Sequence, residues 1–184
     1  MTAGSAAEAV PWAVFLRGVN VQGTTIRMAD LLKALEGLPL ANPRTLLASG
    51  NLVCTSALGA QDLKDAIEQR LRSAFGYDAW VVVLPAARLT EIIEACPFPA
   101  DDPAVHAYVT LSSDPGAVEE LAAAARAAGE TLTVLGPDAV AWQAARGGTL
   151  DSGLGKITAR GRFKAATTTR NLRTLVKVSA AMAG

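Results

Sequence analysis

A segment with three prolines, at residues 97–103 (PFPADDP), divides the chain of 184 residues near its middle. Proline has a fixed φ and no backbone N–H, so this segment continues neither a helix nor a central strand. A chain of this length can bury one large core or two small ones. The sequence therefore predicts a flexible tail at 1–10, a subdomain at 11–96, a linker at 97–103 and a second subdomain at 104–184.

The residues before the break alternate between strand-like and helix-like patterns. Apolar runs predict strands at 12–19, 45–54 and 79–84, and apolar residues at helical spacing predict helices at 28–35, 63–75 and 89–93. The middle strand is interrupted at Ser49-Gly50-Asn51, where the glycine indicates a bulge or a close backbone approach. No short internal repeat is visible.

The residues after the break include a hairpin signal. Apolar side chains alternate along 105–111, with His106, Tyr108 and Thr110 predicted on the polar face. An alanine-rich helix is predicted at 115–128, then a hairpin around Gly136-Pro137-Asp138, a weakly helical glycine-rich stretch and a helix at 169–182. Since a purely parallel sheet has no hairpin, the order favours an α+β fold of two small units over one doubly wound sheet.

The charge is distributed unevenly along the chain. Residues 152–184 hold seven Lys and Arg and no acid, whereas the preceding residues hold ten basic and seventeen acidic groups. Such asymmetry indicates a basic segment that lies on an acidic face of its own protein or meets an anion.

Several function classes receive no support from the residues. The apolar runs are too short to cross a bilayer, and residues 1–10 do not resemble a signal peptide. Cys54 and Cys96 fit neither a disulfide framework nor zinc spacing, and His106 has no evident catalytic partner. We therefore expect a cytoplasmic protein without a membrane segment, metal or cofactor. Whether it is an enzyme, and which residues would be catalytic, is open.

Three polar segments interrupt apolar elements, and together they carry a family resemblance. Residues 16–23 (LRGVNVQG), 49–53 (SGNLV) and 169–171 (TRN), followed by Thr174 and Lys177, resemble in this order the signature of a bacterial family known as domain of unknown function 1697. The resemblance runs from Val14 to Lys177. It implies an α+β fold of two subdomains, the first ferredoxin-like, but no agreed activity, cofactor or catalytic residue.

The third polar segment is predicted at the start of the last helix. The positive end of a helix dipole disfavours a cation by about 0.3–1 kcal/mol, so Arg170 there needs a negative group beside it. A phosphate or carboxylate ligand would satisfy both the guanidinium and the dipole. Alternatively, the negative group belongs to the protein, with the C-terminal helix packing back on the first unit.

The first hypothesis is accordingly that a small anionic ligand is bound, or transformed without a cofactor, in a cleft between the two subdomains. The predicted ligand-binding residues are Arg17, Asn20, Ser49, Asn51, Lys156, Thr169, Arg170 and Asn171. The structural alternative for the asparagines is that they supply turn hydrogen bonds.

Two further hypotheses remain open. Single-stranded nucleic acid could follow the basic C-terminal stretch, although aromatic residues make up only 5% of the chain. A purely structural or partner-docking role is the other, and a monomer or a homodimer would fit either.

Overall fold

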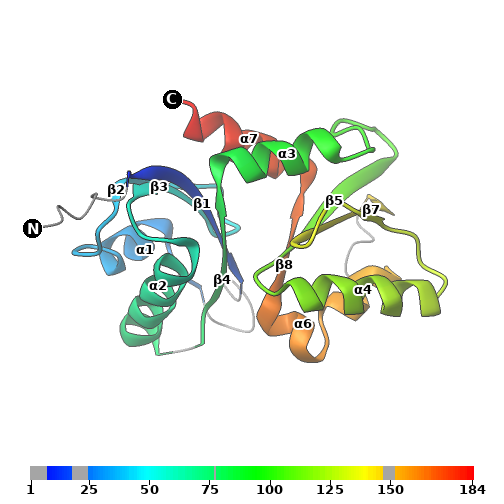
Figure 1. Cartoon of the computed structure of the whole chain (residues 1–184), viewed down its shortest axis with the longest axis horizontal. Coiled ribbons are helices and arrows are strands. Elements are labelled where there is room, and N and C mark those ends of the chain that lie inside the picture. Colours follow the sequence, from blue (N-terminus) through cyan, green and yellow to red (C-terminus); the bar gives the residue numbers. More distant parts are fainter. Residues whose placement is uncertain (1–7, 18–24, 77, 147–151) are drawn as a thin grey trace, which may run out of the picture. The chain divides into compact units, whose positions relative to one another are not determined.

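Two four-stranded antiparallel sheets organise the residues that the computed structural model describes, which are 8–17, 25–76, 78–146 and 152–184 (Figure 1). The chain divides into a first unit of residues 1–86 with 181–184 and a second unit of residues 87–180. The boundary therefore precedes the proline segment, which lies inside the second unit. The observed units differ in this respect from the predicted bounds of 11–96 and 104–184.

The first unit has the ferredoxin-like element order that the resemblance implied. Its elements are β1 (Val10–Arg17), α1 (Met28–Ala34), β2 (Ala41–Leu46), β3 (Asn51–Ser56), α2 (Ala60–Phe75) and β4 (Trp80–Pro85). The strand order is β2-β3-β1-β4, with every neighbouring pair antiparallel. This is the split β-α-β arrangement, in which a hairpin strand lies between the two strands joined by a helix.

Helices α1 and α2 cover one face of the first sheet (Figure 1). Alternate residues of β1, such as Val14 and Leu16, point toward this face because successive strand side chains alternate in direction. Leu63, Ile67 and Leu71 of α2 are fully buried against them, at the four-residue spacing that places them on one helix face. Burying one such leucine contributes about 1.5–3 kcal/mol.

The predicted strand at 45–54 is wrong, because the structure has two strands joined by a turn at 47–50. Gly50 has a φ of +75°, a left-handed conformation that glycine adopts without strain. Asn51 is fully buried, and its Nδ2 donates to the Leu46 carbonyl at 2.8 Å and to Ser49 Oγ at 2.9 Å. The chain thus reverses at this segment, rather than passing through it with a bulge.

The second unit repeats the topology of the first, which the sequence did not reveal. Its elements are α3 (Ala86–Ala95), β5 (Val105–Ser112), α4 (Pro115–Ala127), β6 (Thr133–Val134), β7 (Ala139–Ala145), α5 (Gly153–Thr158), α6 (Gly161–Ala166), β8 (Thr167–Asn171) and α7 (Leu172–Met182). The strand order β6-β7-β5-β8 corresponds, strand for strand, to β2-β3-β1-β4. The predicted hairpin at residues 136–138 is confirmed as the β6–β7 turn.

The last strand corrects the prediction of a helix that begins at residue 169. Thr167–Asn171 pairs with β5, since β-branched threonines suit a pleated strand. Helix α7 begins at Leu172, and Asn171 caps it by accepting from the Arg173 N–H at 2.9 Å. The glycine-rich stretch, predicted to be weakly helical, contains the two short helices α5 and α6.

The face of β5 predicted to be polar is covered by helices instead. Tyr108 packs against the core of Val118 and Leu121 from α4, and Thr110 is 1% exposed. Thr110 Oγ1 accepts from Trp142 Nε1 at 3.0 Å and lies 2.8 Å from Thr169 Oγ1. The hydroxyls on this face are therefore compatible with burial, because they hydrogen-bond to one another and to the indole.

Candidate functional site

Two of the predicted polar segments meet at one corner of the first unit. Arg17 is the last residue of β1, and the N–H of its neighbour Leu16 donates to the Gly50 carbonyl at 2.8 Å. The turn at 47–50 therefore lies beside the end of β1. We call Arg17 together with this turn the β1 corner. Asn20, the other predicted residue of the first segment, lies outside the described residues.

Arg17 is half-buried at this corner, where its backbone pairs with Trp80 of β4. Burial lowers the pKa of its guanidinium from the usual value. The cause is desolvation, which removes water from a charged group and penalises the charged form. A negative group that binds next to this guanidinium offsets that penalty.

The turn at the β1 corner has an unusual backbone. Leu47 has a φ of +59°, and its side chain is 46% exposed. A branched residue in the left-handed region costs about 1–2 kcal/mol. Strain of this kind persists where the surroundings enforce it, and it is concentrated at binding and catalytic sites. An exposed leucine in a strained turn beside a half-buried arginine is thus a candidate ligand site.

The predicted residues of the second unit have mainly internal partners. Arg170 is 8% exposed in β8, where its Nη1 donates to Thr168 Oγ1 at 2.7 Å and to the Thr169 carbonyl at 3.0 Å. The prediction that Arg170 lies in a first helical turn is wrong, so the helix-dipole argument does not apply to it. Asn171 serves as a helix cap, and Lys156 is exposed on α5.

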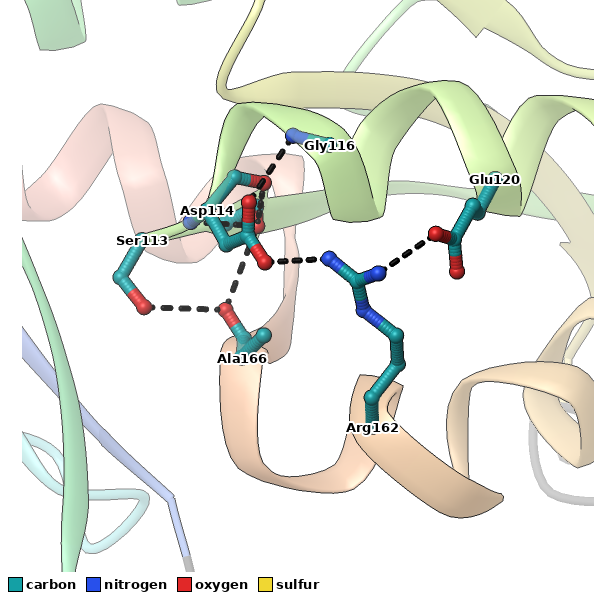
Figure 2. Close-up of polar contacts among 7 residues, drawn as sticks. Ser113, Asp114, Gly116, Glu120, Arg162 and Ala166 are labelled. Atoms are coloured by element: carbon teal, nitrogen blue, oxygen red, sulfur yellow. Dashed lines mark hydrogen bonds and ion pairs between the residues drawn. The ribbon is translucent and has the colours of Figure 1, made fainter.

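The basic segment is partly neutralised by acids of its own unit (Figure 2). Arg162 of α6 forms ion pairs with Asp114, which caps α4, and with Glu120, six residues further along the chain in α4. Arg173 donates from Nε to the Ala100 carbonyl at 2.8 Å. The alternative prediction was that the basic segment lies on an acidic face of its own protein, and this holds for Arg162. The acidic residues belong to α4 and its cap, however, and not to the first unit.

The ion pair between Arg162 and Asp114 makes the stability of the fold depend on pH in the acid range. The hydrogen bond from Arg162, followed by the N–H of Gly116, lowers the pKa of Asp114. A lowered carboxyl pKa stabilises the fold above the unfolded value of about 3.9, and this contribution is lost as the pH falls through the folded value. We expect Asp114→Asn, which preserves the cap, to flatten the decline of the urea midpoint between pH 5 and about pH 2.

Arg162→Gln should flatten the same decline, since the two variants remove opposite ends of one interaction. An unchanged acid dependence in both variants would show that the ion pair does not contribute to stability. Because both side chains are about half exposed, the effect should shrink when salt is added.

The other chemically reactive side chains give weaker indications of a functional site. Burial raises the pKa of the Cys54 thiol to about 11, so the thiolate is scarce at neutral pH. His106 Nδ1 lies 3.2 Å from the Tyr108 hydroxyl. Within the described residues, no three His, Cys, Asp or Glu side chains are grouped as metal ligands. The helices of that part of the chain also include none with the length and apolarity needed to cross a membrane.

A hollow of about 590 Å³ lies elsewhere in the first unit. It is bounded by Pro11, by Asn42 and Arg44 of β2, by residues 53–55 of β3 and by residues 182–184. Of the predicted site residues that the structure describes, none lines it. Arg44 Nη2 donates to the Ala181 carbonyl at 2.5 Å, which commits this guanidinium to the end of the chain's last helix.

The fold and the sequence together define an α+β protein of two ferredoxin-like units. Residues 10–140 match the family described as "Protein of unknown function (DUF1697)", and the chain belongs to this family. No curated protein is significantly similar in sequence. Among solved structures, the conserved bacterial protein SP0830 from Streptococcus pneumoniae is similar with a TM-score of 0.76, at 18% identity, over 95% of this chain and 99% of that one. At this identity the similarity shows the fold.

Proposed function

We propose that the protein binds a small anion at the β1 corner. The observation that carries the proposal is the half-buried guanidinium of Arg17, with its pKa lowered by desolvation, at the strand end beside the 47–50 turn. Strand ends and the loops next to them are frequent ligand sites, because a rigid sheet positions groups that a loop exposes.

The turn offers groups that suit such a ligand. Ser49 is exposed, and its Oγ accepts from Asn51 Nδ2, which fixes the orientation of the hydroxyl. A hydroxyl that accepts from an amide can still donate its own hydrogen, so this arrangement is compatible with donation to an anion. Charge-assisted hydrogen bonds from a guanidinium and a hydroxyl are roughly twice as strong as neutral ones.

Titration calorimetry with phosphate, sulfate and acetate tests the proposal on the full chain. We expect at least one of these anions to bind, and Arg17→Gln to weaken binding at least tenfold, which corresponds to the loss of about 1.4 kcal/mol. The melting temperature should change by only a few degrees, since Arg17 is at a strand end.

The matched control is Arg27→Gln, which removes a guanidinium of the first unit that is 85% exposed and paired with Asp30. Its affinity should equal that of the unmodified protein. Anion binding that survives Arg17→Gln unchanged, or that Arg27→Gln reduces equally, would refute the proposed site.

The alternative of nucleic-acid binding gains no specific support from the geometry. Arg162 and Arg173 of the basic segment bond to groups of the second unit, and Arg170 is buried. These three are therefore poorly available to a phosphate track. A gel-shift with a single-stranded oligonucleotide at low salt checks this alternative, for which we expect no shift.

A further inference from the structure

A groove of about 450 Å³ lies at the outer edge of the second sheet. Helix α4 lines one side of this groove, and β6 with the turn that follows it lines the other. β6 is the outer strand of the sheet, so within the described residues no strand pairs with it on the side away from β7. The second unit thus has an open strand edge next to one side of a helix.

The backbone of Val134 in β6 has two hydrogen-bonding groups at this edge. The Leu135 N–H donates to the Ala139 carbonyl of β7 at 2.9 Å. Hydrogen-bonded and non-bonded pairs alternate along an antiparallel ladder, so the next pair, Val134 and Val140, is a non-bonded one. The N–H and the C=O of Val134 consequently point away from β7, where they can bond to a further strand.

The side chain of Val134 adds an apolar surface to this edge. It is 53% exposed, the highest value among the exposed large apolar side chains that the structure describes. It lies on the same face of the sheet as Val140, which belongs to the core that contains Val118 and Leu121 of α4. Across the groove from Val134 lie Val118 and Ala122, so the middle of the groove is apolar.

Two charged side chains of α4 lie on either side of this apolar middle. Glu119 and Arg126 are seven residues apart, which is about 10 Å along a helix, and Ala122 lies between them. Both are exposed, and among the described residues neither side chain has an ion pair or a hydrogen bond. On the neighbouring side of α4, Glu120 is instead paired with Arg162 of α6 (Figure 2).

We propose that this groove is the interface of a homodimer, in which a second copy of the chain packs about a two-fold axis. An acid and a base on one helix side are complementary to the same side of a second helix that runs in the opposite direction. With the axis next to Ala122, Glu119 faces Arg126 of the second copy, and Arg126 faces its Glu119. Alanines at 122 and 123 are small enough to let the two helices approach closely.

The same two-fold axis brings the two β6 strands together. Ala122 and Val134 line one groove, so an axis that passes next to Ala122 also passes near Val134. Each Val134 N–H then donates to the Val134 carbonyl of the second copy, and the two four-stranded sheets continue as one. A second copy therefore satisfies the strand edge, the apolar middle and both charges at once. The proposal is independent of the anion site, which lies in the first unit.

Sedimentation velocity on the full chain tests the proposal. Over protein concentrations from about 1 µM to 1 mM, a range that covers weak and moderate affinities, we expect a monomer to convert into a dimer. Val134→Lys should remove the dimer, because a lysine on an edge strand opposes strand pairing. Since Val134 is exposed, the thermal unfolding of this variant should change little. A chain that stays monomeric throughout this range would overturn the proposal.

Charge reversal identifies the interface. Glu119→Arg and Arg126→Glu each convert two attractions across the axis into two repulsions, so each should raise the dissociation constant about tenfold or more. The matched control is Glu94→Arg, which reverses an exposed acid of α3 outside the groove and should leave the dissociation constant unchanged. A dimer that neither the reversals nor Val134→Lys weaken would have its interface elsewhere and would refute this one.

Mixing the two reversal variants gives the sharpest test. In a mixed dimer the new arginine at position 119 faces the new glutamate at position 126, and Arg126 of one copy faces Glu119 of the other. Each variant alone should sediment as a monomer at a concentration where the equimolar mixture sediments as a dimer. A mixture that remains as monomeric as its components would contradict the two-fold pairing of these residues.

Discussion

Trp142→Ala is expected to destabilise the second unit by about 3–5 kcal/mol, the range for truncating a large buried aromatic side chain. Trp142 is 1% exposed, and its ring stacks on Tyr108 with centroids 4.9 Å apart. Its Nε1 also donates to Thr110 Oγ1 at 3.0 Å. Removal therefore leaves a cavity and at the same time deprives a buried hydroxyl of a partner. Urea unfolding followed by circular dichroism measures the change.

Two smaller substitutions divide this effect into packing and hydrogen bonding. Trp142→Phe keeps most of the ring but removes the donor, and Thr110→Val removes the acceptor that Trp142 and Thr169 share. Each should cost about 1–3 kcal/mol, because a buried polar atom is left without that partner. The double variant should cost less than the two single changes added together. A loss below about 1 kcal/mol for Trp142→Ala would show that this core is not well packed.

The elements best predicted from the sequence are those whose signals are local. Helix α2 has its apolar residues at helical spacing and ends at Gly76, which takes up the left-handed cap conformation with a φ of +68°. The β6–β7 turn has Gly-Pro-Asp between two apolar segments. In both cases the residues that decide the structure are within a few positions of one another.

The elements that escaped prediction depend on partners far away in the sequence. Thr110 is polar, as strand residues that face solvent commonly are. It is nevertheless buried, because Trp142 and Thr169, which lies 59 positions later, supply its hydrogen bonds. The same pairing makes Thr167–Asn171 a strand, although its threonines and asparagine are typical of a helix N-terminus. Local propensity favoured the cap, and tertiary pairing overrode it.

The candidate site was predictable in part. Polar residues at the end of a strand and around a glycine indicated the β1 corner, and the pairing of β1 with β3 brings these two segments together. The function of Asn51 within its own turn was foreseen only as an alternative. The repeated topology of the two units could not be recognised from the sequence, since the turn at 47–50 (LASG) and the turn at 135–138 (LGPD) share only their leucine.

The boundary between the two units depends on a contact that cannot be predicted from a local sequence pattern. Prolines at 97–103 interrupt secondary structure, but they do not decide which unit α3 joins. Arg88 fixes α3 to the β6–β7 turn through Asp138 and the Leu135 carbonyl, 50 and 47 positions away. The hydrogen bonds from Arg88 to these two groups of the turn thus attach helix α3 to the second unit.

Gly136→Ala should disrupt this attachment and cost about 2–4 kcal/mol, from backbone strain together with weakened charged hydrogen bonds. Gly136 has a φ of +133°, which residues with a side chain rarely adopt, and a Cβ there would lie 2.3 Å from Arg88 Nη2. The guanidinium must move, and its bonds to Asp138 and Leu135 lengthen or break. Urea unfolding at neutral pH measures the loss.

Gly129→Ala is the matched control, because Gly129 also has a positive φ, of +73°, with no atom within 4 Å of the added Cβ. It should show the backbone strain alone, about 1–2 kcal/mol. In an Arg88→Met background the cost of Gly136→Ala should fall toward that of the control, since the guanidinium that the methyl group displaces is gone. A cost that does not depend on Arg88 would mean that strain in the turn, rather than the arginine, makes glycine necessary at this position.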